Sequence, residues 1–287
     1  MQRNTGYFPT ESLEPCGNRL FSRSALNEGY LFRGSLSLTR PNASLRLSNG
    51  FDKTGKEIAM QKTIVPCAAF DRAAAQKVLR QVLQKPDSTL CLATGDTTAG
   101  IFTRMVELKQ ALDLDCARVK CINMDEYVGV RREEPASCYF RIVRDLYAPL
   151  GLREDQFYVP VAPTSQAQQE RERFARKLRG FGGNGHIAFN EPGADFGAHI
   201  HVANLTQSTL QAKAELFGGA DKVPAQGLTL GIADVMAARH ILLVANGVHK
   251  AEIIRRALEG PITPEVPASV LQLHPNLDIL LDEAAAQ

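Results

Sequence analysis

Three short segments concentrate the residue types that hold anions or move protons. Thr94 to Thr98 (TGDTT) follows the apolar run TLCLA, and Asn123 to Tyr127 (NMDEY) ends the run RVKCINM. The third segment, Gly182 to Gly193 (GGNGHIAFNEPG), contains one histidine and one glutamate. Ligands of open α/β sheets bind at the carboxyl ends of the strands, so segments at such ends are candidates for one site.

The Thr94–Thr98 segment has the outline of a phosphate site. Gly95 lets the backbone approach an anion, the hydroxyl groups can donate hydrogen bonds, and a following helix presents free N–H groups at its N-terminus. The segment lacks the GxxxxGK[ST] pattern of nucleotide hydrolases, and Asp96 opposes an anion unless it points away as a helix cap. An ordinary capped turn is the competing interpretation.

Asp125 and Glu126 are adjacent acids at the end of a predicted strand. Neighbouring strand positions face opposite ways, so at most one of the two carboxylates should point into a cleft. A partly desolvated aspartate has a raised pKa and can abstract a proton next to a carbonyl group. A solvated loop acid is the alternative.

His186 and Glu191 lie five residues apart in the glycine-rich segment. Imidazole titrates near neutrality and can both take and give a proton, and a carboxylate can orient it. This spacing favours a proton relay, with a purely structural histidine as the alternative. A metal site at His199 and His201 is a weaker interpretation, because no third ligand is evident nearby.

From Met60 onward, apolar runs alternate with amphipathic segments, which is typical of a parallel sheet flanked by helices. One Rossmann-like α/β domain spanning residues 60–287 is therefore the simplest architecture. Helical periodicity predicts helices at 70–83, 101–112, 136–147, 165–179 and 249–258. Apolar runs predict strands at 89–93, 118–124, 157–161, 240–245, 269–273 and 277–281.

Composition and charge narrow the function classes. Of 287 residues, 44% are hydrophobic and 22% charged, and the formal net charge is +2, so no overall field favours nucleic acid or an acidic membrane. No apolar run is long enough to span a membrane, and we expect a cytoplasmic protein. The cysteines have no CxxC or zinc-like spacing, which predicts buried reduced thiols.

Residues 1–59 are rich in Ser, Arg, Asn, Gly and Leu and have no sustained helical period. We expect a disordered extension, or translated sequence upstream of a start at Met60. Glu11, Glu14 and Glu28 argue against an organelle transit peptide, which is poor in acidic residues.

Four motifs in order, ATGDTT, INMDEYVG, GNGHIAFNEPG and VPASVLQLHP, resemble the glucosamine-6-phosphate deaminase family, the glucosamine/galactosamine-6-phosphate isomerase group. The resemblance covers about Met60 to the end of the chain. It implies isomerisation and deamination of glucosamine 6-phosphate to fructose 6-phosphate and ammonia, without a metal or organic cofactor. The implied partner is an amino sugar phosphate, with no nucleic acid or membrane, and a homo-oligomer is left open.

The resemblance implies a role for each matching catalytic position. Asp125 falls on the base that moves a proton between C2 and C1 of the opened sugar. His186 falls on the acid and base that opens the ring, Glu191 on its carboxylate partner, and Asn184 on a third ring-opening position.

The matching phosphate-binding positions are Thr94, Gly95, Asp96, Thr97 and Lys250. Their chemistry suits a phosphate dianion, which needs N–H groups and at least one cation.

This sequence departs from the family pattern at several points. Glu215 stands where the family has a phosphate-binding arginine, and His201 and Ala203 replace the basic pair that serves allosteric activation. Arg179 runs almost directly into the glycine-rich residues 180–183, so we expect that the apolar strand that family members place before the histidine loop is missing. Two alternatives therefore stay open: a 6-phosphogluconolactonase-like hydrolase, and a catalytically impaired sugar-phosphate-binding module.

Overall fold

The computed structural model describes residues 45–51, 57–181 and 188–287. The expectations for residues 1–44, Asn184 and His186 therefore lie outside the described residues. Regular structure begins before Met60: the segment Leu45–Phe51 (β1) pairs antiparallel with Glu57–Val65 (β2). Short alternations such as those near Leu45 carry no helical period, and this pairing explains them.

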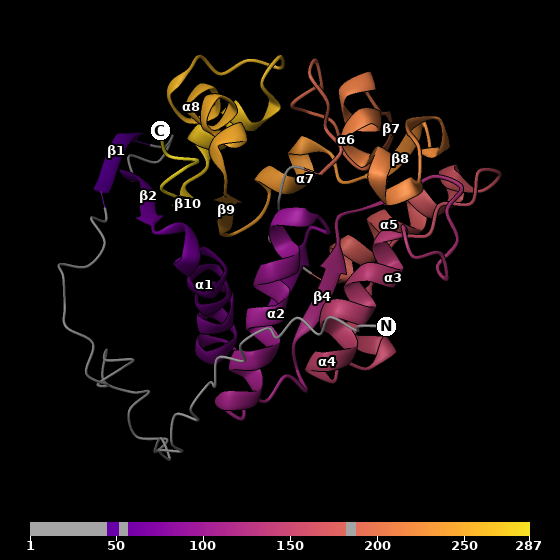
Figure 1. Ribbon diagram of the computed structural model, residues 1–287, viewed down its shortest axis with the longest axis horizontal. Helices are drawn as coiled ribbons and strands as arrows, with labels where there is room; N and C mark the ends of the chain where they lie inside the picture. Colours follow the sequence, from indigo (N-terminus) through magenta and orange to yellow (C-terminus); the bar gives the residue numbers. More distant parts are fainter. Residues whose placement is uncertain (1–44, 52–56, 182–187) are drawn as a thin grey trace, which may run out of the picture. The chain divides into compact units, whose positions relative to one another are not determined.

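The strands form three sheets, of which the one with β1, β2, β10 and β9 can be followed strand by strand in Figure 1. The sheet orders are β1-β2-β10-β9, β3-β4-β6 and β5-β8-β7. Apart from the β1–β2 pair, the strands of the first two sheets run parallel, whereas β5, β8 and β7 are antiparallel. The remaining strand bounds are β3 (Thr89–Leu92), β4 (Lys120–Asn123), β5 (Asp125–Tyr127), β6 (Phe157–Tyr158), β7 (His201–Asn204), β8 (Gln226–Thr229), β9 (Ile241–Ala245) and β10 (Asn276–Asp282).

Helices connect the parallel strands. The α-helices are α1 (Phe70–Gln84), α2 (Asp96–Ala111), α3 (Cys138–Ile142), α4 (Ala148–Leu150), α5 (Ala167–Phe181), α6 (Gln207–Phe217), α7 (Ile232–Met236) and α8 (Ala251–Glu259). Short 3₁₀ helices occur at η2 (Cys67–Ala69), η4 (Glu154–Gln156), η5 (Ala220–Lys222), η6 (Val248–Lys250) and η7 (Pro267–Leu273), and η3 (Val143–Tyr147) is a π turn.

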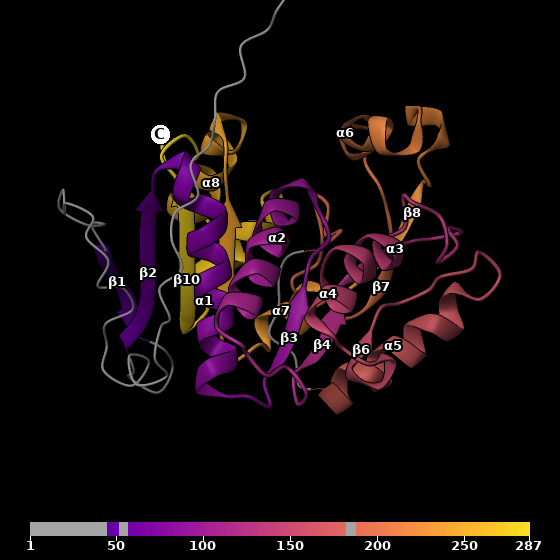
Figure 2. The same cartoon turned by 60° about the horizontal axis from the view of Figure 1, so that its bottom comes forward.

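Alternate residues of the parallel strands pack into two separate hydrophobic cores. On β10, Leu280 joins the core under α1 and α2, whereas Ile279 and Leu281 join the core that contains α5, α7 and α8. Helices α1 and α2 run side by side along one face of the strands (Figure 2). The strands are thus covered on both faces, which is why their apolar runs are nearly continuous. The predicted α/β fold with parallel strands flanked by helices is confirmed.

The parallel strands are divided between β3 and β9. In the described part of the chain, β3 pairs only with β4, and β9 pairs only with β10. Helix α5 ends at Phe181, and the described residues 188–200, which precede β7, contain no strand. The structure of the described residues therefore agrees with the expectation that one strand is absent at this point.

The predicted element at 269–273 is wrong. The segment Pro267–Leu273 forms a 3₁₀ helix, with proline at its first turn. The Ser269 hydroxyl accepts a hydrogen bond from Thr263 N–H at 2.9 Å and donates one to Thr263 O at 3.1 Å. Proline presets the helical φ, and these serine bonds hold the turn, so the segment with the apolar residues Val270, Leu271 and Leu273 does not form a strand.

Candidate active site

The loops after β3 and β4 are joined by a chain of hydrogen bonds. Thr94 Oγ1 donates to Asn123 Oδ1 at 3.1 Å, and Asn123 Nδ2 donates to the backbone oxygen of Asp125 at 2.8 Å. Asn123 itself is fully buried at the end of β4. The first two of the three segments singled out in the sequence therefore lie together at the carboxyl ends of neighbouring parallel strands.

Asp125 is a buried carboxyl group with 6% exposure. Burial raises the pKa of Asp125 to about 7, and the nearby Glu126 carboxylate adds to this rise. A hydrogen bond from the Cys138 thiol, with 3.8 Å between Sγ and Oδ1, lowers the pKa, as does the charge of Lys213. The result is a carboxylate that can take up or release a proton near neutral pH.

Glu126 has a different environment, although it is adjacent to Asp125. Its carboxylate accepts backbone N–H groups from Tyr127 at 2.9 Å, Cys138 at 3.0 Å and Tyr139 at 2.9 Å. These bonds fix the start of α3 against β5 and occupy the glutamate. The Glu126 carboxylate is thus occupied by backbone N–H groups, whereas within the described residues the Asp125 carboxylate accepts only the Cys138 thiol.

The Thr94–Thr98 loop is closed at the start of α2 by a capping pair. Gly95 N–H donates to Thr98 Oγ1, and Thr98 Oγ1 donates to Gly95 O, both at 2.9 Å. Thr97 Oγ1 donates to Asn246 Oδ1 at 3.0 Å, which connects this loop to the turn after β9. A Cβ added at Gly95 would meet no atom within 4 Å, so the backbone borders open space there.

Asp96 is surrounded by cations that the sequence analysis did not identify. Its carboxylate lies 3.3 Å from Lys213 Nζ on α6 and 3.6 Å from an Arg141 guanidinium nitrogen on α3. These contacts place positive charge beside the loop and offset the charge of Asp96, which is not a side-chain helix cap. Local spacing could not have revealed either contact, because both side chains reach Asp96 from helices that are distant in the sequence.

Lys250 lies in η6, after the β9 turn, and is exposed. The turn is fixed because Gly247 N–H donates to both carboxylate oxygens of Asp282, at 3.0 and 3.1 Å. Gly247 has a φ of +86°, a conformation that favours glycine. No ion pair is formed by Lys250 with any residue in the described ranges, which leaves its ammonium group open to an anion.

Glu191 is held at the N-terminus of α6. Its carboxylate accepts hydrogen bonds from Thr206 N at 3.2 Å, Thr206 Oγ1 at 3.1 Å and Thr209 Oγ1 at 2.6 Å. The preceding Phe189 ring packs on Tyr127 with 5.1 Å between centroids. A Cβ at Gly227 would lie 2.4 Å from the Phe189 ring, so a glycine is required for this packing. The described part of the third segment thereby contacts β5 and β8.

The other residues considered in the sequence lie apart from these contacts. Glu215, which the motif resemblance aligns with a phosphate-binding arginine, is exposed on α6. His199 Nδ1 is 2.8 Å from Asp234 Oδ1, and His201 Nδ1 is 2.9 Å from His199 O. Within the described residues, no group of three or more His, Cys, Asp or Glu side chains could hold a metal ion.

Comparison with known proteins identifies the same family that the four sequence motifs resemble. Residues 66–279 match the family model described as glucosamine-6-phosphate isomerases/6-phosphogluconolactonase. A glucosamine-6-phosphate deaminase of Geobacillus sp. (strain WCH70) is 38% identical over 226 residues, which cover 75% of this chain and 90% of the relative. Another, from Lachnoclostridium phytofermentans, is 36% identical over 221 residues, or 74% of this chain and 94% of the relative.

Solved structures give a matching result. A structure described as a monomeric glucosamine-6-phosphate deaminase superposes with a TM-score of 0.75 at 31% identity, covering 79% of this chain and 98% of that one. A 6-phosphogluconolactonase from Thermotoga maritima superposes with a TM-score of 0.60 at 15% identity, covering 78% and 100%. The second likeness shows the fold alone.

The fold and these relatives together define the class of protein as an α/β enzyme. The chain belongs to the glucosamine-6-phosphate isomerase/6-phosphogluconolactonase family. Within that family, the relatives named as deaminases share far more of its sequence than the lactonase structures do. Among the residues described, no helix is both long and apolar enough to cross a membrane.

Proposed function

We propose that this chain isomerises and deaminates glucosamine 6-phosphate to fructose 6-phosphate and ammonia, a step of amino-sugar breakdown. The observation that carries the proposal is Asp125, a buried carboxyl group with a pKa raised to about 7, beside a helix-capped loop that can hold a phosphate. Relatives named for this activity are up to 38% identical to the chain. The reaction class is isomerase and deaminase.

Asp125 is the base of the proposed reaction. Its carboxylate removes the C2 proton of the opened amino aldose while O1 takes up a proton from water, which gives an enolamine, and it then returns its proton to C1 to leave a protonated imine at C2. The resulting imine at C2 takes up water and releases ammonia. A pKa of about 7 suits both proton transfers. At neutral pH the ionised carboxylate can accept a proton, and the protonated carboxyl group can donate it again.

The phosphate of the substrate is held at the start of α2 in this proposal. Thr94, Gly95, Asp96 and Thr97 supply hydroxyl and backbone donors, and the helix N-terminus favours an anion. Lys250 supplies a cation from the β9 turn, which Thr97 and Asn246 connect to the same loop. Lys213 and Arg141 add charge that the missing arginine at Glu215 does not provide.

Ring opening is assigned to the glycine-rich segment. His186 acts as acid and base, with Asn184 beside it, and Glu191 is the carboxylate partner; the support for these roles is the motif resemblance. The position of Glu191 is supported by its bonds to Thr206 and Thr209, which hold it where α6 meets β5 and β8. A phosphorylated substrate is retained inside cells by its charge, so we place the reaction in the cytoplasm.

A second candidate is a sugar-phosphate-binding module without turnover. The division of the sheet between β3 and β9 and the exposed Glu215 favour it. The burial of Asp125, which raises its pKa to about 7, favours the enzyme.

Purified protein should be assayed for ammonia release from glucosamine 6-phosphate, with hydrolysis of 6-phosphogluconolactone measured in parallel. Ammonia release supports the proposal. Lactone hydrolysis alone would replace it with the lactonase function. A thermal shift with glucosamine 6-phosphate but without ammonia would establish the binding module instead.

A further inference from the structure

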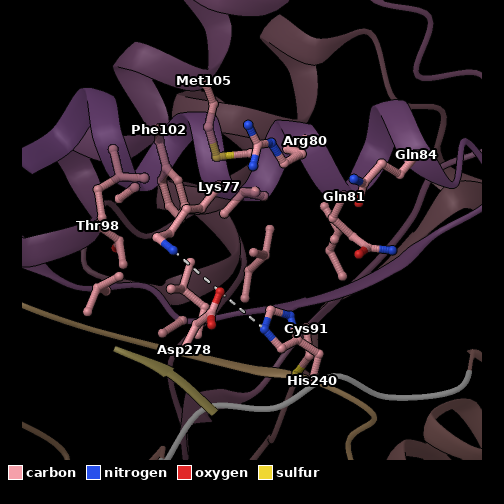
Figure 3. A pocket seen from close by; sticks show the side chains of 18 of the residues that line it. Lys77, Arg80, Gln81, Gln84, Cys91, Thr98, Phe102, Met105, His240 and Asp278 are labelled. Atoms are coloured by element: carbon pink, nitrogen blue, oxygen red, sulfur yellow. Dashed lines mark hydrogen bonds and ion pairs between the residues drawn. The ribbon is translucent and has the colours of Figure 1, made fainter. Parts of the chain in front are cut away.

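A cavity of about 310 Å³ lies between β3 and β9, with α1 and α2 on one side of it (Figure 3). Asp125, Glu191 and Lys250 do not line it, and it meets the candidate active site only at Thr98, at the start of α2. Residues of β3 and β9 line it together with side chains of α1 and α2. In the described residues, one edge of β3 and one edge of β9 have no partner strand.

The side chains of the two strands have the pattern of an interior position in a sheet. On β9, Leu242 and Val244 are half-buried and line the cavity, whereas Ile241 and Leu243 are buried. On β3, Leu92 also lines the cavity and is half-buried. Interior parallel strands are normally buried on both faces. Within the described residues, the half-buried apolar side chains of β3 and β9 therefore lack a neighbouring strand that would cover them.

The strands β3 and β9 run in the same direction along the cavity. Their carboxyl ends are connected, because Thr97 Oγ1 donates to Asn246 Oδ1 at 3.0 Å. Their amino ends are neighbours too, because a second hollow is lined by Thr89 at the start of β3 and by His240 just before β9. Unpaired N–H and C=O groups on two parallel edges match an extended chain that runs parallel between them.

The amino end of the cavity has several basic side chains. Lys77 Nζ and His240 Nε2 both lie 3.4 Å from the single carboxylate of Asp278, as the dashed lines in Figure 3 show. Arg80 also borders this end, and no described residue forms an ion pair with its guanidinium group. An acidic residue at the start of an inserted segment would complement this charge.

We propose that the cavity is a binding site for an extended segment of a partner protein, which adds a strand between β3 and β9. The segment runs parallel to both strands. It begins with an acidic residue beside Lys77 and Arg80, and continues with about five apolar residues, since β3 has four residues and β9 has five. Main-chain hydrogen bonds supply affinity, and Leu242 and Val244 select apolar side chains. This inference does not depend on the proposed reaction.

The test uses the full chain and the fluorescein-labelled peptide acetyl-DIVLVAK-amide, with binding followed by fluorescence anisotropy. Saturable binding is expected, together with a raised Tm. The same peptide with N-methylated amides at the apolar positions should bind at least ~10-fold more weakly, because it cannot donate to the strand edges. A peptide that starts with lysine should also bind more weakly. Equal binding of the N-methylated peptide would overturn the proposal.

Variants of the chain locate the binding site. Leu242→Arg should abolish binding, whereas Ile253→Arg, at an exposed apolar position on α8 outside the cavity, should not change it. The Tm of each variant without peptide shows whether it is folded. If Leu242→Arg does not fold, the N-methylated peptide and the peptide that starts with lysine still test the proposal. Unchanged peptide binding by folded Leu242→Arg would contradict the proposal. Self-association of the chain that Leu242→Arg abolishes would assign the cavity to a second copy and overturn the partner assignment.

Discussion

Cys138 lies against the carboxyl group of Asp125, with 3.8 Å between Sγ and Oδ1, and both side chains are buried. The thiol donates to the carboxylate and so favours its ionised form. Burial dominates and raises the pKa of Asp125 to about 7, and the thiol opposes that rise. The cysteine therefore helps to keep the proposed base active at neutral pH.

Replacing Cys138 with alanine should change the pH dependence of the reaction. Removal of the donor raises the pKa of Asp125 further, and a base must be deprotonated to act. The acid limb of the kcat/KM profile should thus move to higher pH. Cys138→Ser retains a hydrogen-bond donor and should leave the limb closer to that of the original chain. Superimposable profiles for all three proteins would show that the thiol does not influence the base.

Asp125→Asn should stabilise the fold above neutral pH. The folded-state pKa of Asp125, about 7, lies above the ordinary value of 3.8. Its contribution to stability is therefore present in full below pH ~4 and is lost as the pH rises through 7. Asparagine does not ionise, so the variant should have a higher Tm than the original chain at pH 8, by an equivalent of about 4 kcal/mol at most. The difference should shrink toward pH 5.

Asp278→Asn is the matched control, because the pKa of Asp278 is shifted in the opposite direction to that of Asp125. Burial raises the pKa of Asp278, but hydrogen bonding to His240 and the charge of Lys77 outweigh it, so the net pKa is lowered. Its stabilising contribution is present above its unfolded pKa and is lost as the pH falls through the folded one. The variant should be less stable than the original chain at neutral pH, with a smaller difference in acid. If both variants showed the same pH dependence in thermal unfolding, the raised pKa of Asp125 and the lowered pKa of Asp278 would be refuted.

Lys213→Met should weaken substrate binding. The lysine offsets the charge of Asp96 beside the proposed phosphate loop, at 3.3 Å, and it lowers the pKa of Asp125. Loss of one charge-assisted contact corresponds to roughly 10-fold or more in affinity. We expect a higher KM, weaker inhibition by inorganic phosphate, and an acid limb shifted to higher pH. Lys222→Met, a lysine in η5, serves as the control for loss of positive charge.

Glu215→Arg should strengthen phosphate binding. Glu215 is exposed on α6, so the exchange should not disturb packing. It replaces an anion with the bidentate donor that the family resemblance implies at this position. The inhibition constant of inorganic phosphate and the KM for glucosamine 6-phosphate should both fall. If neither changes, Glu215 does not border the phosphate.

The sequence predicted those parts of the fold that local patterns specify. The periodicity of residues 70–83 and the buried run at 89–93 correspond to α1 and β3, because apolar spacing is set within each element. The antiparallel set of β5, β7 and β8 was not predicted, since strands of three and four residues depend on pairing partners far along the chain. At Ser269, side-chain bonds to Thr263 overrode an apolar run.

The candidate site was predicted to a similar extent. Motifs identified Asp125 and Thr94, which the hydrogen bonds of Asn123 bring together. They did not identify Lys213 or Arg141, because those side chains reach Asp96 from separate helices. Such contacts depend on tertiary structure, because helical spacing predicts only which side chains share one face of a helix.

The central claim is that Asp125 is the base of an amino-sugar-phosphate deaminase. The most direct measurement is the rate of ammonia release from glucosamine 6-phosphate by the original chain and by Asp125→Asn, with a thermal-shift titration of the same ligand. We predict a loss of roughly 100- to 10,000-fold in rate, as for removal of a general base, while the ligand still stabilises the variant. Ammonia release by Asp125→Asn at the original rate would contradict the account.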